Sequence, residues 1–264
     1  MKPDYKNWVP KSMVCGLAGG TIAVFILFLL FGASGTILHG TPRLVCGILF
    51  GIGTLVLLFF AVWMGALHRT FDYNGKRKLA KTIIEGTAKY ITIPDGGTGL
   101  DVGCGSGALT IASAKRNPKA TMVGCDIWSG AYKGVFTKKR CEDNAKAEDV
   151  SNIRFEEGNA IHLPFADESF DAVTSNYVYH NISGHDKQKL LLETLRVLKK
   201  GGIFAIHDLM SKARYGDMDA FVKRLKADGY EEVRLIDTTD GAFMGSKEAS
   251  WLGLSGSTLL IGKK

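Results

Sequence analysis

A motif near residue 100 reads Leu100-Asp101-Val102-Gly103-Cys104-Gly105-Ser106-Gly107-Ala108. Apolar residues that suit a buried strand lead into three alternating glycines, after which a helical stretch begins. Glycines at such a bend let the backbone turn tightly and approach a ligand without obstruction from a Cβ atom, and the N-terminus of the following helix faces the same place. The motif therefore predicts a strand–loop–helix unit that binds a small molecule.

Strand and helix signals alternate along the chain around this motif. Strands are expected at Gly99–Gly103, Thr121–Asp126, Ile153–Glu157, Phe170–Ser175 and Ile203–Asp208. Helices are expected before and between them, at Lys76–Tyr90, Ala108–Arg116, Ala131–Ala147 and Asp186–Lys199. Short apolar strands that alternate with helices predict an α/β domain with a mostly parallel sheet covered on both faces.

The carboxyl-terminal part of the chain follows a different order. A helix is expected at Asp217–Asp228, followed by strands at Glu232–Thr238 and Ser257–Gly262. We expect these two strands to close the edge of the sheet, one of them antiparallel. The span between them, Thr239–Gly256, has no clear period, and we interpret it as a flap over the site.

Two long stretches near the N-terminus carry no charge, Ser12–Gly35 and Leu44–Leu67. Each reaches the roughly 20 residues that a helix needs to cross about 30 Å of hydrocarbon. The alternatives are a buried hairpin of a soluble core and a cleaved signal peptide, since Ala33-Ser34-Gly35 offers small residues. The first run is longer than a signal core and a second follows at once. The sequence therefore predicts a two-helix transmembrane anchor within residues 1–70 and a catalytic domain in residues 71–264.

Charges around the apolar stretches predict their orientation. The connector Thr36–Arg43 has one firm positive charge, whereas the outer flanks have several: Lys2, Lys6, Lys11, Arg69, Lys76, Arg77, Lys78 and Lys81. The positive-inside rule then places both termini and the catalytic domain in the cytoplasm. The run at residues 76–78 could attract anionic membrane lipids at about 1 kcal/mol per charge, or it could form a solvated helix face.

Two glycine pairs in the apolar stretches have GxxxG spacing, Gly16/Gly20 and Gly47/Gly51. This spacing lets helix backbones approach closely in lipid. It is compatible with a homodimer through these faces, but glycine is also common in membrane helices. Both interpretations stay open.

Composition argues against two other classes of function. The chain has a net charge of +7, divided almost evenly between the anchor region and the rest, and no stripe of Lys and Arg with interleaved aromatic residues. Nucleic acid is therefore not an expected partner. The five cysteines occur singly and no His/Cys spacing suggests zinc, so no metal site is expected.

The ligand of the glycine loop has two candidates. Gly103, Gly105 and Ala108 fit the G-x-G-x-x-A pattern of dinucleotide-binding domains, with Asp126 as a ribose-binding acid, which would indicate an NAD(P)-dependent oxidoreductase. Asp101, however, stands two residues before the first glycine, where a pyrophosphate would gain nothing from a carboxylate. An acid there suits a ligand with an ammonium group and no phosphate. S-adenosylmethionine (SAM) is such a ligand.

Four motifs in order resemble those of the class I SAM-dependent methyltransferases. They are Asp101-Val102-Gly103-Cys104-Gly105-Ser106-Gly107, Gly158-Asn159-Ala160 with Leu163-Pro164-Phe165, Ser169-Phe170-Asp171-Ala172-Val173, and Arg196-Val197-Leu198-Lys199-Lys200-Gly201-Gly202. The mixture is similar to the subgroup that includes quinone and small-molecule methyltransferases. The resemblance implies a Rossmann-like fold with a mostly parallel seven-stranded sheet.

The same resemblance implies a cofactor site. Its residues are Asp101, Gly103, Cys104, Gly105, Gly107, Asp126, Ile127, Asn159, Ala160 and Asn176. The glycines would border the methionine part of SAM, with Asp101 toward its ammonium group. Asp126 would accept hydrogen bonds from both ribose hydroxyls. Asn159 stands where the family more often has Asp, although an amide oxygen can still accept from the adenine amino group.

The acceptor side is less defined by the sequence. His180 follows the fourth strand and is the candidate general base, with Tyr177 as a wall of the sulfonium site. His207 and Asp208 form a second candidate pair, and His180 could also be an ordinary surface or core histidine. An anchor at the bilayer raises the local concentration of a membrane-soluble acceptor, so a hydrophobic or lipid-like molecule such as an isoprenoid quinone is the expected substrate. A non-catalytic membrane scaffold with a SAM-type fold is the alternative.

Overall fold

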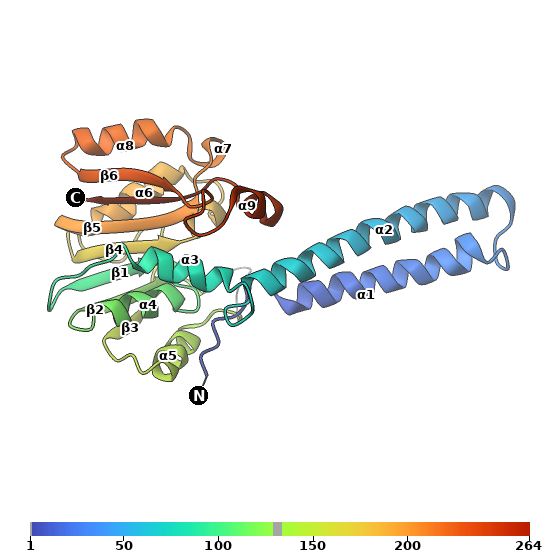
Figure 1. Cartoon of the computed structure of the whole chain (residues 1–264), viewed down its shortest axis with the longest axis horizontal. Coiled ribbons are helices and arrows are strands. Elements are labelled where there is room, and N and C mark those ends of the chain that lie inside the picture. The colour runs from blue at the N-terminus through green and yellow to red at the C-terminus, as the bar shows by residue number, and fades with distance from the viewer. Residues whose placement is uncertain (1, 129–133) are drawn as a thin grey trace. The chain divides into compact units, whose positions relative to one another are not determined.

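A computed structural model describes residues 2–128 and 134–264 of the chain. The chain divides into two compact units (Figure 1). One consists of Met1–Lys6 together with Lys81–Lys264, and the other of Asn7–Ala80. The second unit is therefore an insertion, in chain order, between two parts of the first.

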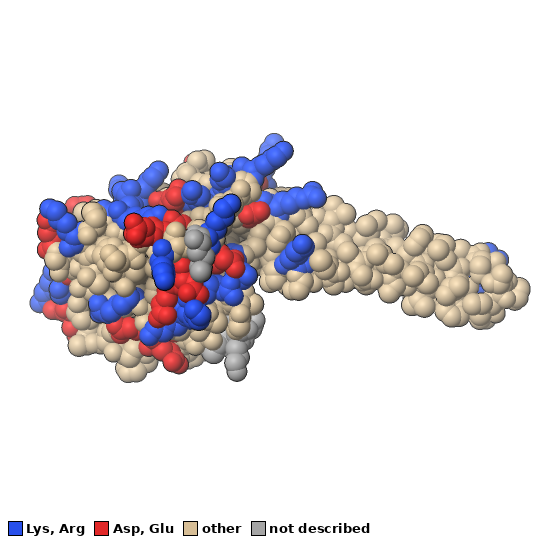
Figure 2. Space-filling model, turned by 90° about the horizontal axis from the view of Figure 1, so that it is seen from below, with Lys and Arg blue, Asp and Glu red and all other residues tan. Residues whose placement is uncertain are grey.

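The inserted unit is a hairpin of two long helices. Helix α1 (Lys11–Leu27) continues as a π-helix, η1 (Phe28–Ala33), and α2 spans Gly40–Phe71. Both are long and apolar enough to cross a membrane. Large apolar side chains along them are mostly exposed, and Figure 2 shows an almost uncharged surface there. Water would solvate such a surface poorly, and by length and composition both helices are candidate membrane spans.

Glycines bring the two helices of the hairpin together. A Cβ atom on Gly32 would lie 2.5 Å from the Cα atom of Gly47, and Gly51 faces the ring of Phe28. The predicted Gly47/Gly51 face is therefore used inside the hairpin. A Cβ atom on Gly16 would meet nothing within 4 Å, so a homodimer contact through the Gly16/Gly20 pair stays a prediction.

The larger unit is built on a seven-stranded sheet in the order β3-β2-β1-β4-β5-β7-β6. The strands are β1 (Thr98–Val102), β2 (Thr121–Asp126), β3 (Ile153–Glu157), β4 (Phe170–Asn176), β5 (Leu198–Leu209), β6 (Glu231–Asp237) and β7 (Ser257–Lys263). The first five are parallel, and β7 lies antiparallel between β5 and β6. This confirms the predicted α/β class and its mostly parallel sheet.

Helices connect these strands along the chain. They are α3 (Leu79–Ala88), α4 (Ala108–Arg116), α5 (Lys138–Ala147), the short 3₁₀ turn η3 (Tyr179–Asn181), α6 (Lys187–Arg196), α7 (Lys212–Tyr215), α8 (Met218–Ala227) and α9 (Ser246–Leu252). The chain adds β2 and β3 on one side of β1 and then crosses to add β4 and β5 on the other side, so the strand order reverses direction at β1. Ligands bind at such a switch point, outside the carboxyl ends of the strands.

Three predicted boundaries were wrong for local reasons. The helix predicted from Ala131 begins at Lys138, where the hydroxyl of Thr137 accepts from the Arg140 N–H as an N-cap; residues 129–133 lie outside the described chain. The helix predicted to reach Lys199 ends at Arg196, and β5 starts early at Leu198 with a register shift against β4. The expected flap contains a helix, α9, that showed no sequence period.

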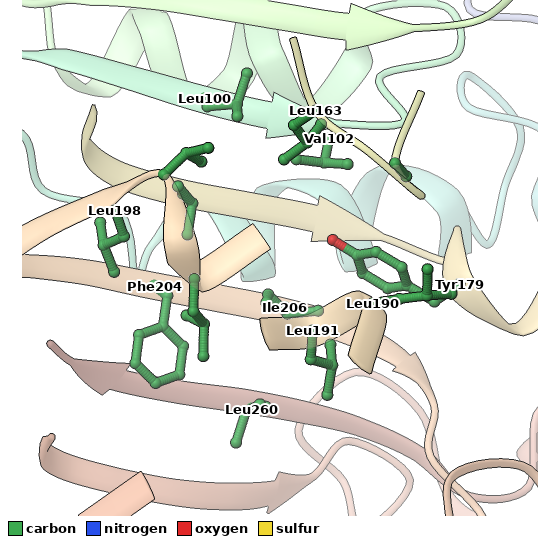
Figure 3. Packing of buried hydrophobic residues seen from close by; sticks show 14 of the residues in the cluster. Leu100, Val102, Leu163, Tyr179, Leu190, Leu191, Leu198, Phe204, Ile206 and Leu260 are labelled. Atoms are coloured by element: carbon green, nitrogen blue, oxygen red, sulfur yellow. The ribbon is translucent and has the colours of Figure 1, made fainter. Parts of the chain in front are cut away.

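The core lies around the central strands (Figure 3). Leu100 on β1, Ile206 on β5 and Leu260 on β7 are fully buried. Tyr179 of η3 is also fully buried, and its hydroxyl lies 2.6 Å from that of Thr194 on α6. The turn after β4 is therefore fixed to the core by a satisfied hydrogen bond, which positions the residues around it.

Candidate functional site

The glycine loop lies between β1 and α4, as the sequence predicts. Gly103, Gly105 and Gly107 have φ angles of 71°, 56° and 82°, a region that costs glycine little. Space is also restricted, because a Cβ atom on Gly103 would lie 2.4 Å from a methyl group of Val178. The N–H groups of Gly103 and Cys104 donate to the Cys125 carbonyl at 2.7 and 3.1 Å. The loop is thus held to the end of β2.

Asp126 ends β2 beside this loop. One oxygen of its carboxylate accepts from the Gly105 N–H at 2.9 Å, and the other accepts from the Trp128 N–H at 2.8 Å. The indole N–H of Trp128 in turn donates to the Gly105 carbonyl at 3.1 Å. The carboxylate predicted to bind ribose is therefore already oriented by backbone donors. Its remaining lone pairs suit a pair of hydroxyl groups.

Asp101 is fully buried on β1, where its carboxylate accepts from the Thr110 hydroxyl at 2.6 Å. Burial raises the pKa of Asp101 to about 7; the Thr110 hydrogen bond opposes this shift and the negative charge of Asp126 adds to it. Two carboxyl groups at the ends of adjacent strands repel each other, and a cation between or beside them relieves that repulsion. This pair of carboxyl groups therefore fits a cationic ligand such as SAM and is unfavourable for a pyrophosphate.

The predicted adenine side lies next to Asp126. The Gly158 N–H donates to the Asp126 carbonyl at 3.1 Å, which brings the loop after β3 beside Ile127, a residue with 45% of its surface exposed. The amide oxygen of Asn159 accepts from the Ile161 N–H at 2.9 Å. Ala160 is buried in the core cluster. Any contact of Ala160 with a cofactor would therefore come from its backbone.

Cys104, like Ala160, has a buried side chain. Burial raises the pKa of its thiol well above the usual value, with the neighbouring Cys141 adding to the shift. The thiol of Cys141 donates to the Gly105 carbonyl at 3.2 Å. These thiols are packing groups of the loop, so any contact of Cys104 with a ligand would come from its backbone.

Asn176 and His207 face each other across β4 and β5, 2.8 Å apart. The other ring nitrogen of His207 lies 2.8 Å from the hydroxyl of Thr238, which is also 2.9 Å from the Ser257 carbonyl. The amide oxygen of Asn176 can only accept, so the Nδ1 atom of His207 carries the proton and donates to it, and Nε2 accepts from the Thr238 hydroxyl. Burial lowers the pKa of His207 to about 3. His207 is a fixed neutral imidazole without a free nitrogen.

Tyr177 lies against this network in a left-handed backbone conformation, with φ of 54°. Its hydroxyl is 2.7 Å from that of Ser257, which donates to the Leu254 carbonyl, so the Tyr177 hydroxyl is the donor. Its ring centroid is 4.7 Å from that of His207. The ring of Tyr177, not its hydroxyl, is the part available to a ligand. A strained non-glycine residue of this kind is often found at functional sites.

His180 pairs with Asp208 in the turn after β4. The Nδ1 atom of His180 lies 2.5 Å from one oxygen of the fully buried Asp208, whose other oxygen accepts from the Tyr179 N–H at 2.8 Å. Burial alone would raise the pKa of Asp208, but its hydrogen bonds and the positive charge that His180 carries when protonated outweigh burial and hold the pKa below its usual value. An ionised carboxylate at Nδ1 leaves Nε2 of His180 as the proton acceptor.

Asp208 binds His180 and not His207, with which it forms the second candidate pair in the sequence. His207 and Asp208 are adjacent at the end of β5, but successive residues of a strand point to opposite faces. The partner, His180, comes from a 3₁₀ turn that no periodicity marks. Thr238 and Ser257 were not predicted as site residues, since isolated hydroxyl residues at strand ends carry no distinctive signal.

Comparisons with known proteins bear on this arrangement. A family described as "Methyltransferase domain" matches residues 100–206. The chain is 31% identical to the demethylmenaquinone methyltransferase of Bacillus velezensis over 180 residues, which cover 63% of this chain and 72% of the relative. The chain belongs to the SAM-dependent methyltransferases. A second demethylmenaquinone methyltransferase, from Lactobacillus johnsonii, is 36% identical over 43% of this chain and 44% of that relative.

Solved structures of other proteins show the same fold. The [4+2]-cyclase SpnF aligns with a TM-score of 0.53 at 20% identity, covering 73% of this chain and 85% of SpnF. A geranyl diphosphate methyltransferase, solved with GPP and sinefungin, aligns with a TM-score of 0.50 at 15% identity, covering 77% and 81%. SAM is the cofactor of this methyltransferase chain, and the residues at the carboxyl edge of the sheet fit it.

Replacing Asp126 by Ala should weaken SAM binding by at least about tenfold, because a bidentate charged acceptor and the brace on Gly105 are lost together. Isothermal titration calorimetry measures the affinity. Asp95→Ala is the matched control, since Asp95 is an exposed carboxylate paired with Lys119. Equal affinity of the Asp126 variant and the native protein would contradict the proposed cofactor site.

The pKa of Asp101 predicts a pH dependence of SAM binding. A cationic ligand favours the carboxylate, so binding below the pKa of about 7 requires loss of a proton and affinity should fall as pH is lowered from 8 to 6. The unliganded protein behaves in the opposite way: between about pH 4 and 7 its folded state holds a proton that the unfolded state has released, so stability falls as pH rises.

Calorimetry in buffers of different ionisation enthalpy measures the proton released on binding, and thermal unfolding of the unliganded protein measures its stability. The Asp101→Asn variant cannot titrate, so its SAM affinity should be nearly flat over the same range. A native protein whose affinity does not change between pH 8 and 6 would rule out this role of Asp101.

Proposed function

We propose that this chain is a membrane-anchored enzyme that transfers the methyl group of SAM to a hydrophobic, quinone-like acceptor, with His180 as the general base. The observation that carries the proposal is the His180–Asp208 pair at the carboxyl edge of the sheet, beside the strand ends that carry the cofactor motifs. The relatives named demethylmenaquinone methyltransferase support the acceptor class.

The residues on the acceptor side support a proton-transfer role for His180. SAM supplies a methyl group on a positively charged sulfur. An acceptor oxygen or carbon attacks the methyl carbon in line, and the sulfur leaves as a neutral thioether. Asp208 holds His180 with its Nε2 atom able to take the proton that the acceptor loses, and it stabilises the imidazolium that results. Among the residues that the structure describes, no hydrogen bond occupies that nitrogen. Tyr177 and the neutral His207 provide a polar but uncharged wall beside it.

The hairpin supports the choice of a membrane-soluble acceptor. Its helices have the length and apolar surface of membrane spans, and an enzyme held at the bilayer meets a lipid-soluble substrate at a raised local concentration. Lysines and arginines flank the hairpin on the side of the two termini, which supports a cytoplasmic catalytic unit. A non-catalytic scaffold would not need a histidine held against a buried carboxylate, whose burial costs stability.

Incubation of membranes with methyl-labelled SAM should transfer label to a lipid-extractable acceptor when the native chain is present. His180→Gln should lower kcat by roughly 10²–10⁴-fold while the Kd for SAM stays the same. Asp208→Asn should lower kcat in the same direction, because it loses the charge that orients the imidazole. His162→Gln is the control, since His162 has an 88% exposed side chain. An unchanged kcat in the His180 variant would refute the role of His180 as general base. The absence of any labelled product with the native chain would refute the proposed methyltransferase activity.

The orientation of the hairpin can be read by labelling introduced thiols. Thr36→Cys lies in the connector and should react with a membrane-impermeant maleimide in intact cells. Asn74→Cys lies past the end of α2 and should react only after permeabilisation. The native cysteines give little background, because three are buried and Cys15 and Cys46 lie in the apolar helices. The reverse labelling pattern would overturn the proposed topology.

A further inference from the structure

The segment that precedes the hairpin packs with the catalytic unit. We call residues 2–6 the N-terminal strap. The Asp4 N–H donates to the side-chain oxygen of Asn144 at 2.7 Å, and the Asn144 amide donates back to the Asp4 carbonyl at 3.1 Å. The Asp4 carboxylate lies 2.8 Å from the guanidinium of Arg140, and the Tyr5 hydroxyl donates to Glu148 at 3.0 Å. The strap therefore follows α5 through both backbone and side-chain contacts.

Asn144 joins this strap to the glycine loop. The same amide nitrogen that binds the Asp4 carbonyl also donates to the Ser106 carbonyl at 3.0 Å. Ser106 lies between Gly105 and Gly107, both in the left-handed region. Asn144 is 2% exposed, and all its polar atoms are used in these contacts. One buried side chain thus holds a segment from the start of the chain and the loop of the cofactor site in fixed relation.

We infer that the strap is part of the cofactor site, and that Asn144 is the positioning residue through which it acts. Three glycines give the loop freedom that must be removed before it can present its backbone to a ligand, and groups that lock a binding loop in advance raise its affinity. Asn144 removes that freedom at Ser106, and the strap fixes the side chain of Asn144. This inference rests on the assignment of the glycine loop to SAM.

The chain order gives the strap a consequence for the whole protein. Residues 7–80 form the hairpin unit, so the strap and the rest of the catalytic unit are separated by the entire anchor. A chain shortened to begin after the hairpin loses the strap along with the anchor. Such a chain keeps every cofactor motif, yet it leaves the Asn144 oxygen without the Asp4 donor and binds SAM more weakly than the full chain.

The test uses the full chain in detergent and measures the Kd for SAM by calorimetry. Asn144→Ala should raise the Kd about tenfold, as expected for the loss of a buried positioning hydrogen bond. A strap variant carrying Pro3→Gly, Asp4→Gly and Tyr5→Ser, with both lysines retained, should raise it severalfold. Lys139→Ala is the control on the same helix, because Lys139 makes only an exposed pair with Asp143, and its Kd should not change.

Non-additivity distinguishes a positioning role from general support of the fold. In the Asn144→Ala background the strap changes should have no further effect on the Kd, because their route to the loop is already broken. Lower thermal stability with an unchanged SAM Kd in both variants would overturn the inference, as would fully additive effects. If Asn144→Ala does not fold, the strap variant by itself is a sufficient test, because an unchanged SAM Kd in that variant overturns the inference. A native chain that binds no SAM would instead refute the cofactor site itself.

Discussion

The bend between β1 and α4 exists because three of its residues lack a Cβ atom and because Asp126 braces it from the next strand. The carboxylate of Asp126 accepts from the Gly105 N–H, so the loop and the end of β2 form one rigid edge. The left-handed angles at Gly103, Gly105 and Gly107 would be strained for any other residue. The β1–β2 pairing, the packing of α4 and the position of α5 all converge on this edge. A change there would therefore alter the cofactor site before it altered the core.

Two buried acids at the same end of the sheet, Asp101 and Asp208, have pKa values shifted in opposite directions, and their surroundings explain why. Burial raises the pKa of Asp101 to about 7; the hydrogen bond from the Thr110 hydroxyl opposes this rise and the nearby carboxylate of Asp126 adds to it. Asp208 is buried as deeply but has a histidine and backbone N–H groups, so its pKa falls. A cation of the ligand would relieve the first carboxyl group, whereas the ring of His180 and a backbone N–H group already bind the second. In the proposed function, Asp101 thus lies on the cofactor side of this edge and Asp208 on its proton-transfer side.

Much of the catalytic unit was predictable because its signals are local. The glycine spacing, the acids at strand ends and the apolar runs fixed five parallel strands and placed Asp101 and Asp126 together. The site's acceptor side was less predictable, since the pairing of His180 with Asp208 depends on a 3₁₀ turn and on the face that each strand residue takes. Helix α9 and the early start of β5 were missed because tertiary packing, not periodicity, forms them.

The two-unit organisation has a physical logic of its own. An isolated apolar hairpin has no reason to fold with a soluble domain, yet the residues directly before the hairpin and those after it belong to one compact unit. Fixing both ends of the inserted segment to one folded unit restricts the separation of those ends, which lowers the entropy lost when the two helices pair. The close approach of Gly32 and Gly47 then needs only the small gains that glycine contacts supply in lipid. In this inference the strap therefore has two roles. It positions the glycine loop through Asn144, and it joins one end of the hairpin to the larger unit.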